Sequence, residues 1–484
     1  MSANETLLLI GGKNVPASSG ATFERRNPLT GEVVTIAAAA SVADAIAAAE
    51  AAAKAFPVWS AMSASARRKI LQKAADILQE RAPQFMRVVS DETGAPEAWG
   101  AFNCMLAASV LREAAAMTTQ VQGEVIPSDK PGYFSMAVRA PAGVVLGIAP
   151  WNAPVILGVR AVATPLAVGN TVILKCSEIS PHTHRLIGDC LMEAGMPDGA
   201  INVITNAAPD SGKVVEALIA HPAVRRVNFT GSTRVGRIIG ALSGQHLKPC
   251  VLELGGKAPM VVLDDADLDA AVKGAAFGAY SNQGQICMST ERLIVDNKIA
   301  DAFVDKLAAK AKSLPAGDPK NGNVVLGSMV SVEAAESIER LIQDAVSKGA
   351  KLVAGGVREG SIMEASVLDH VTKDMHIYTE ESFGPIVSVI RGDGDEELIR
   401  LANDTEYGLS SAVFGSNIQR AMYVANRMEA GICHINGPTV QDEPMMPFGG
   451  VKSSGFGRFG GRYAVAEFTD LKWLTIEDNP HYPF

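Results

Sequence analysis

The sequence is poor in several features that define particular classes of protein. Only 5% of its 484 residues are aromatic, and its six cysteines are widely spaced without a C-x-x-C pair. This spacing indicates neither a zinc site nor a disulfide framework, so we interpret the cysteines as free thiols and expect no metal. A basic excess is also absent, because the net charge is −9. The charge therefore argues against a nucleic-acid partner.

Long apolar runs are missing as well. The run from Leu7 to Ile10 near the N-terminus is too short for a signal peptide or a membrane span. We therefore expect a cytoplasmic protein without a membrane partner. Hydrophobic residues make up 48% of the chain and charged residues 20%, which is typical of soluble globular enzymes. A chain of 484 residues exceeds what one hydrophobic core supports, so we expect two or three domains.

Alternating helix and strand patterns organise most of the chain. Ser41 and Asp44 form a capping-box signature before an alanine-rich stretch, which predicts a helix that ends at Pro57. A second amphipathic helix is predicted over residues 64–79. From about residue 143, short runs rich in β-branched residues alternate with helical segments, and the same alternation restarts after Gly256. This order is typical of parallel sheets in α/β domains.

These patterns predict an α/β fold with two domains and a small β element. The first domain comprises residues 1–121 and 140–253, and the second comprises residues 254–450. Residues 122–139 and 468–484 show alternating patterns that predict strands, which we interpret as an oligomerisation hairpin and its partner strand. Because such a hairpin would otherwise leave an unpaired edge, we expect a homo-oligomer, at least a dimer.

Two glycine-rich segments are candidates for a dinucleotide site, which needs a turn between a strand and a helix N-terminus. The segment from Gly455 to Gly460 matches G-x-G-x-x-G, but no strand precedes it, so we interpret it as a loop. The segment from Phe229 to Gly236 follows a predicted strand and opens a helix. Its glycines, Gly231 and Gly236, are five residues apart, which is not the usual spacing.

Cys287 and Glu253 are the first candidates for catalysis. Cys287 follows a predicted helix in a polar segment that contains Gly284, although a free cysteine is most often a small buried apolar residue. Glu253 lies at the end of an apolar strand and precedes two glycines, where burial would raise its pKa and let it act as a base. The alternative is a salt bridge between Glu253 and Lys257.

Further polar residues follow other predicted strands, at the edge where open α/β sheets place ligands. Asn152 follows the strand VVLGIA, and its amide could donate to an oxyanion. Lys175 and Glu178 lie in TVILKCSE, just past another predicted strand end, and suit the hydroxyls of a ribose. An ordinary surface ion pair would have the same sequence pattern.

Together these segments resemble the aldehyde dehydrogenase superfamily across essentially the whole chain. The similarity rests on the ordered motifs PWN, LKCSE, FTGSTRVG, LELGGK, GQIC, EESFGP and PFGGVKSSGFGR. It implies the fold of that family, in which the first domain is a Rossmann-like NAD-binding domain and the second is catalytic. It also accounts for the five-residue spacing of the glycines, since the family uses a variant of the dinucleotide site.

The resemblance also assigns roles to the candidates. In the family, the residue at Cys287 is the nucleophile that forms a thioester, Glu253 is the general base, and Asn152 completes the oxyanion hole. Lys175, which we include in the catalytic set, holds the adenosine ribose with Glu178, whose carboxylate favours NAD over NADP. Cofactor contacts are expected at Ile148, Trp151, Lys175, Glu178, Gly212, Phe229, Thr230, Gly231, Ser232, Val235, Gly236, Leu254, Glu381 and Phe383.

The resemblance points to an aromatic aldehyde as the small-molecule substrate. We expect the substrate pocket to include Trp99, Leu157, Arg160, Ile286, Met288 and Met445. Arg160 indicates a substrate with a hydroxyl or a carboxylate, and Trp99 could stack on a ring, although structural packing would explain either residue. Phe459 replaces a glutamate found in many relatives, so a proton relay through that position is absent.

Residues 150–166 resemble the benzaldehyde, vanillin and salicylaldehyde dehydrogenase branch, and salicylaldehyde dehydrogenase most closely. We therefore predict oxidation of a hydroxybenzaldehyde, salicylaldehyde to salicylate, in bacterial aromatic catabolism. A succinate-semialdehyde-type dehydrogenase is the nearest alternative, with Arg160 binding the carboxylate. A crystallin-like structural protein is an alternative of another class, but such a role would not require Cys287, Glu253, Asn152 and Lys175.

Overall fold

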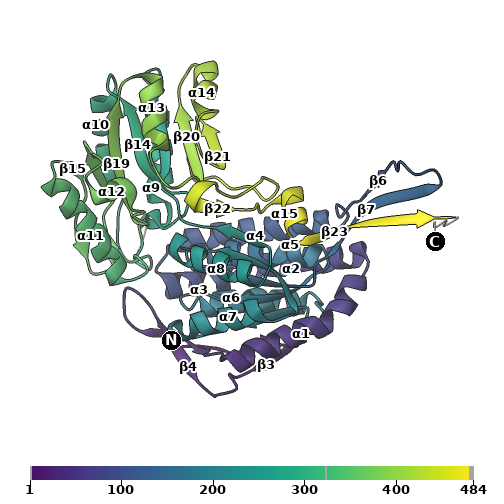
Figure 1. Ribbon diagram of the computed structural model, residues 1–484. Coiled ribbons are helices and arrows are strands. Elements are labelled where there is room, and N and C mark those ends of the chain that lie inside the picture. Colours follow the sequence, from purple (N-terminus) through teal and green to yellow (C-terminus); the bar gives the residue numbers. More distant parts are fainter. Residues whose placement is uncertain (1–2, 322–323, 479–484) are drawn as a thin grey trace.

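The computed structural model describes residues 3–321 and 324–478, which form two open α/β sheets and a protruding three-stranded sheet (Figure 1). This arrangement confirms the α/β class predicted from the sequence. In Figure 1 the second open sheet, with β13 to β21, stands above the first, and the three-stranded sheet extends to one side. Within the two described ranges, no helix is long and apolar enough to cross a membrane.

The first open sheet has the strand order β22-β12-β11-β8-β9-β10-β2-β3 and a parallel centre from β12 to β10. Every residue of β8 and β9 is buried, as expected for strands covered on both faces. From β8 the chain adds β9 and β10 on one side and then crosses to add β11 and β12 on the other. The strands are β2 (Leu8–Ile10), β3 (Lys13–Val15), β8 (Val144–Ile148), β9 (Thr171–Lys175), β10 (Ile201–Ile204), β11 (Val224–Thr230), β12 (Cys250–Glu253) and β22 (Gly455–Phe456).

The helices that belong with this sheet include both of those predicted from the sequence, but the first is longer than predicted. The capping box of Ser41 and Asp44 is present, but the first helix continues through Pro57 to Ala61. Its last turn is anchored by Trp59, which is fully buried and donates from its indole to the Leu166 carbonyl at 3.1 Å. This anchor offsets the cost of about 3 kcal/mol of an interior proline. The helices are α1 (Val42–Ala61), α2 (Ala64–Glu80), α3 (Ala82–Thr93), α4 (Glu97–Met117), α5 (Pro154–Ala167), α6 (Pro181–Glu193), α7 (Ser211–Ala220) and α8 (Thr233–Gln245).

The segment from Gly455 to Gly460 is only partly the loop that we expected. Its first two residues form β22, which pairs antiparallel with β12. A side chain at Gly455 would place its Cβ 2.0 Å from the Leu252 carbonyl oxygen, so this glycine permits the close approach of two strands. The motif therefore serves packing at the sheet edge.

The second open sheet has the order β15-β18-β19-β14-β13-β20-β21 and is parallel except for β15. Its strands are β13 (Ala258–Val262), β14 (Thr290–Asp296), β15 (Lys351–Ala354), β18 (Ser366–Asp369), β19 (Ile386–Gly392), β20 (Ser410–Phe414) and β21 (Ile432–Ile435). Its helices are α9 (Leu268–Tyr280), α10 (Ala300–Lys312), α11 (Val332–Ser347), α12 (His376–Thr379), α13 (Gly394–Asn403) and α14 (Ile418–Ala425).

The protruding sheet consists of β6 (Glu124–Ile126), β7 (Tyr133–Pro141) and β23 (Thr469–Glu477), with β7 in the centre. β23 pairs with β7 along nine residues. It carries exposed apolar side chains, among them Trp473 at 78% exposure. The assignment of this sheet to oligomerisation stays a prediction, as do the domain boundaries, and residues 1–2, 322–323 and 479–484 of the predicted segments lie outside the described residues.

Short elements complete the described chain. They are β1 (Asn4–Thr6), β4 (Thr22–Arg26), β5 (Val33–Ala38), β16 (Arg358–Glu359), β17 (Ile362–Met363), α15 (Gly461–Glu467) and the 3-10 turns η1 (Ala208–Asp210), η2 (Ser281–Gly284) and η3 (Lys452–Ser454). The turn η2 bears on function, because it leads into Cys287.

Candidate active site

The carboxyl ends of β8, β11 and β12 meet at one edge of the first sheet, where the strand order reverses. A cavity of about 250 Å³ opens at this edge, and its opposite wall comes from the segments that precede β14 and β19 of the second sheet. The lining residues are Pro150, Trp151, Asn152, Thr230, Gly231, Ser232, Glu253, Leu254, Gly255, Cys287, Glu381 and Phe383. The structure thus brings the predicted nucleophile, base and oxyanion donor together.

Cys287 is presented by a strained turn. Asn282 and Gln283 both adopt left-handed backbone conformations, with φ of 47° and 56°, which cost about 1–3 kcal/mol each for residues other than glycine. Buried hydrogen bonds hold the turn, because the Asn282 amide donates to the Asn152 carbonyl at 3.0 Å and the Gln283 amide to the Ser328 carbonyl at 2.9 Å. These hydrogen bonds therefore hold the turn that leads into Cys287 in one conformation.

Asn152 is fixed through its backbone and its side chain. Its carbonyl also accepts a hydrogen bond from the Trp99 indole at 2.8 Å. Its side-chain amide donates to the Gln285 carbonyl at 3.0 Å. Because an amide nitrogen carries two hydrogens, the second remains available for an oxyanion.

Glu253 is a deeply buried carboxylate whose burial is only partly compensated. It is 1% exposed, and neither of its oxygens has a hydrogen-bond partner among the described residues. Burial raises the pKa of Glu253 to about 7, and interactions with Cys287, Arg160 and Thr230 oppose that rise. The predicted salt-bridge alternative is wrong, because Lys257 pairs with Glu291 instead. A carboxylate with a pKa near neutrality is suited to general base catalysis.

Cys287 is held as a thiol by its surroundings. Burial raises its pKa well above the ordinary value, and the neighbouring Glu253 and Glu381 carboxylates raise it further. Arg160 has the opposite effect on the pKa of the thiol. Because the thiolate is the reactive form of cysteine, the predicted nucleophilic role of Cys287 would require a nearby base, and Glu253 is a carboxylate that interacts with the thiol.

Glu381 and Phe383 form the wall that faces these two residues. The Gly256 N–H donates to the Glu381 carboxylate at 2.8 Å. Burial raises the pKa of Glu381 to about 8, with the Glu291 carboxylate as the next contribution. A Cβ at Gly255 would lie 2.7 Å from a Glu381 oxygen, so the glycine leaves room for this carboxylate. Phe383 packs edge-to-face on Trp151, with ring centroids 5.7 Å apart.

Other predicted cofactor residues lie at the same edge of the first sheet but outside the cavity. Lys175 ends β9, and its ammonium lies 3.9 Å from the Glu178 carboxylate. Burial lowers the pKa of Lys175, while Glu178 raises it. Ile148 ends β8, and Gly212, Val235 and Gly236 lie in the first turns of α7 and α8. Phe229 is in β11, next to the cavity residue Thr230.

Arg160 is not free to act as an isolated cation. It forms a buried ion pair with Asp442, the two side chains being 7% and 9% exposed. Its guanidinium also lies over the Phe448 ring, 4.3 Å from the centroid. Both Arg160 and Asp442 influence the pKa of Glu253, which places the pair beside the reacting groups.

The remaining predicted pocket residues differ in burial. Leu157 is buried in a cluster with Ala153 and Ile156, against which Trp99 packs. Ile286 and Met288, on either side of the nucleophile, are 5% and 7% exposed. Met445 is 47% exposed, and so lies toward the surface.

Sequence reasoning missed several residues that shape the site. Gln285 lies within the motif GQIC but was given no role, and Asn282 and Glu291 lie outside the quoted motifs. Asp442 lies in the stretch from Val440 to Met445 that we expected to line the pocket, but its pairing with Arg160 was not predicted. Asp442 lies 282 residues from its partner Arg160, a separation that only the fold bridges. The one available signal was Glu291, an acidic residue at the start of the buried strand β14.

Comparisons with known proteins agree across nearly the whole chain. A sequence model described as "Aldehyde dehydrogenase family" matches residues 15–474. A vanillin dehydrogenase of Pseudomonas sp. (strain HR199) is 65% identical over 477 residues, 98% of this chain and 99% of that protein. The structure of a salicylaldehyde dehydrogenase from Pseudomonas putida G7, complexed with salicylaldehyde, matches with a TM-score of 0.98 and 51% identity, covering 99% and 100% of the two chains. A betaine aldehyde dehydrogenase from Staphylococcus aureus in complex with NAD+ matches with a TM-score of 0.95 and 32% identity over 99% and 95%.

Proposed function

The chain belongs to the aldehyde dehydrogenase family, and we propose that it oxidises a hydroxybenzaldehyde to the corresponding acid with NAD as the hydride acceptor. The observation that carries this proposal is the cavity that unites Cys287, Glu253 and Asn152. An unpaired buried carboxylate destabilises a folded protein. Its presence beside a nucleophile is therefore better explained by catalysis than by a crystallin-like structural role, the alternative of another class.

The residues present fit a nicotinamide dinucleotide. The cavity of about 250 Å³ lies at the point where the strand order of an open parallel sheet reverses, the place where such sheets bind ligands. Glu381 would hold the nicotinamide ribose, and Gly255 leaves space for its carboxylate. Lys175 and Glu178 would hold the adenosine ribose at the end of β9. The NAD complex of the betaine aldehyde dehydrogenase relative supports this choice.

Side chains and backbone groups of the protein account for the steps before and after hydride transfer. Glu253 takes the proton of the Cys287 thiol, and the thiolate attacks the aldehyde carbon while the Asn152 amide and the Cys287 N–H donate to the oxyanion. Bound NAD supplies the acceptor for the hydride, and the carbon that loses it remains attached to Cys287 as a thioester. After releasing the thiol proton to solvent, Glu253 deprotonates a water, which attacks the thioester carbon. The carbon–sulfur bond breaks to give the acid, and Glu253 returns the proton from the water to the departing thiolate.

The Arg160 and Asp442 pair supports a hydroxylated substrate over an anionic one. Asp442 neutralises the arginine and can accept a hydrogen bond from a phenolic hydroxyl, but it would repel a substrate carboxylate. A succinate-semialdehyde-type activity is therefore disfavoured. The branch indicated by the sequence includes the vanillin and salicylaldehyde dehydrogenase relatives, and the higher identity to the former, 65% against 51%, favours vanillin over the predicted salicylaldehyde.

The first measurement is NADH formation, followed at 340 nm with NAD and vanillin, salicylaldehyde, benzaldehyde, succinic semialdehyde or propanal. We expect the hydroxybenzaldehydes to give the highest kcat/KM, and Cys287→Ala to abolish turnover. A preference for succinic semialdehyde would contradict the substrate class. If no aldehyde reduced NAD, the dehydrogenase proposal would fall.

A cytoplasmic homo-oligomer, at least a dimer, is also part of the proposal. The oligomeric part of the proposal rests on the exposed apolar side chains of the protruding sheet, including Val125, Trp473 and Ile476, because unpaired apolar strands favour association. Light scattering coupled to size-exclusion chromatography should give a mass of at least two chains. A monomer at micromolar concentration would contradict it.

A further inference from the structure

Lys257 and Glu291 form an ion pair in the interior behind the cavity. Their side chains are 0% and 3% exposed. The Glu291 carboxylate also accepts hydrogen bonds from the backbone N–H of Ser382, at 2.9 and 3.0 Å, and from that of Phe383, at 3.1 Å. One carboxylate thus binds a lysine and the two peptide groups that directly follow Glu381.

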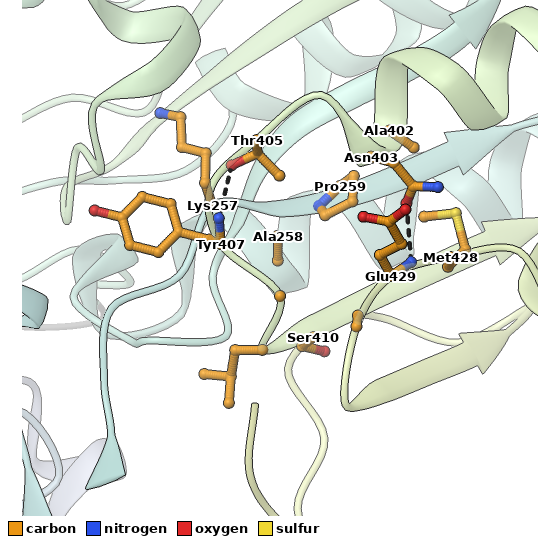
Figure 2. Close-up of a pocket in the computed structure, with 13 residues that line it drawn as sticks. Lys257, Ala258, Pro259, Ala402, Asn403, Thr405, Tyr407, Ser410, Met428 and Glu429 are labelled. Atoms are coloured by element: carbon orange, nitrogen blue, oxygen red, sulfur yellow. Dashed lines mark hydrogen bonds between the residues drawn. The ribbon is translucent and has the colours of Figure 1, made fainter. Parts of the chain in front are cut away.

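The positions of the pair in the chain connect three parts of the site. Lys257 lies four residues after the base Glu253, and Glu291 lies four residues after the nucleophile Cys287. In Figure 2 Lys257 lies at the same end of a narrow cleft as Thr405 and Tyr407. The cleft has only about 10 Å³ of free space, room for about one water. No ligand site is indicated there, and the ammonium of Lys257 is bound by Glu291.

The loop that the pair supports would not hold its shape by itself. Phe383 has a left-handed backbone, with φ of 49°, which is unfavourable for an aromatic residue. The Gly256 N–H binds the Glu381 carboxylate on the cavity side, and Glu291 binds the backbone of the next two residues from behind. The loop is therefore held from two directions.

A purely stabilising role explains this arrangement poorly. Buried ion pairs contribute little net stability, since desolvation cancels most of the attraction, and apolar residues of similar volume often do as well. What an apolar pair could not do is accept the N–H groups of Ser382 and Phe383. The hydrogen bonds to the loop are thus the distinguishing property of Glu291.

We propose that Lys257 and Glu291 are positioning residues of the nicotinamide-ribose subsite, which fix the Glu381–Phe383 loop without touching the cofactor. Neither residue lines the cavity. Lys257 holds the Glu291 carboxylate in place, and Glu291 holds the loop. This role rests on the proposed use of NAD, and it predicts that the pair serves cofactor binding and hydride transfer but not the thiol chemistry of Cys287.

The test compares two reactions of the same protein. NAD-dependent aldehyde oxidation needs the loop, whereas hydrolysis of 4-nitrophenyl acetate, measured without NAD, needs only the Cys287 thiol and its base. The variants are Glu291→Gln and the double variant Lys257→Met with Glu291→Met. The double variant leaves no unpaired buried charge and so protects against loss of folding. Glu193→Gln, which removes a carboxylate from the exposed Arg81 pair, is the matched control.

We expect kcat/KM for NAD to fall about 10- to 100-fold in both test variants, because small displacements of positioning groups have effects of this size. Calorimetry should show a weaker Kd for NAD, while ester hydrolysis and the control variant stay within about twofold of the original protein. Equal losses of both activities would overturn the proposal, since the pair would then support Cys287 itself. Unchanged NAD binding and turnover in the double variant would overturn it too. If the unaltered protein bound no NAD, the proposed function would fail instead.

Discussion

Replacing Glu253 by glutamine should make the protein more stable and nearly inactive. The pKa of Glu253 is raised from 4.5 to about 7, chiefly by burial, and this gap corresponds to about 3 kcal/mol. Since the raised pKa means that the folded state favours the protonated form, the cost is absent below pH 4.5, grows as the pH rises, and is complete above pH 7. Glutamine never ionises, so Glu253→Gln avoids the cost.

Urea unfolding at two pH values measures this effect. We expect Glu253→Gln to be about 3 kcal/mol more stable than the original protein at pH 8 and nearly equal to it at pH 4.5. If the variant and the original protein had the same free energy of unfolding at both pH values, the reasoning would be refuted, because the Glu253 carboxylate would then have a partner that compensates for its burial.

The same variant separates the two halves of the reaction. In this variant Cys287 loses the base that takes its proton, but it also loses a negative charge that raises the pKa of its thiol. These two losses oppose each other in acylation, whereas thioester hydrolysis loses its base without compensation and should slow about 10²–10⁴-fold. Stopped-flow absorbance at 340 nm should therefore show a burst of about one NADH per active site before a slow steady state. Cys287→Ala should show no burst. Steady turnover of Glu253→Gln at the original rate would show that another group activates the water.

Three further substitutions test the surroundings of the site. Asp442→Asn leaves Arg160 as an unpaired buried cation, so we expect a loss of about 3–5 kcal/mol in the free energy of unfolding. The free cation should also raise kcat/KM for 4-formylbenzoate relative to benzaldehyde. An unchanged ratio of the two kcat/KM values would argue against a specificity role for Asp442. Trp99→Phe keeps a ring but removes the donor to the Asn152 carbonyl, and it should lower kcat about tenfold, equivalent to about 1.4 kcal/mol, with little change in KM for the aldehyde; a change confined to KM would favour ring stacking instead. Trp59→Ala leaves a cavity at a fully buried position and should lower the free energy of unfolding, measured by urea denaturation, by about 3–5 kcal/mol. The kcat of the folded fraction should not change. A decrease below about 1 kcal/mol would show that the last turn of α1 does not need this anchor.

Local patterns in the sequence were sufficient for the framework of the site. The strands before Asn152 and Glu253 are apolar runs that end in polar residues, and parallel strands bring their carboxyl ends to one edge. The helix that precedes Cys287 is likewise visible from its alanine-rich pattern. For these reasons the meeting of the three residues follows from strand order and a recognisable set of motifs.

Contacts between residues far apart in the sequence could not be predicted from local patterns. The continuation of α1 through Pro57 depends on the contact of Trp59 with Leu166, more than a hundred residues away. The neutralisation of Arg160 by Asp442 and the pairing of Lys257 with Glu291 likewise depend on tertiary neighbours. Local propensity carries no information on such contacts, so charge states within the site could be derived only from the structure.

The short connection between β12 and β13 has a mechanical consequence. It comprises only residues 254–257, and it joins the sheet that carries Glu253 to the sheet from which Cys287 approaches. The chain returns to the first sheet only between β21 and β22, through a much longer segment, so Gly255 and Gly256 form the shorter of the two joints between the sheets. A Cβ at Gly256 would lie 2.1 Å from the Cys287 carbonyl oxygen, so the joint is packed against the nucleophile itself. The stiffness of these four residues, together with the hydrogen bonds between Asn152 and the turn before Cys287, therefore limits changes in the separation of Glu253 and Cys287.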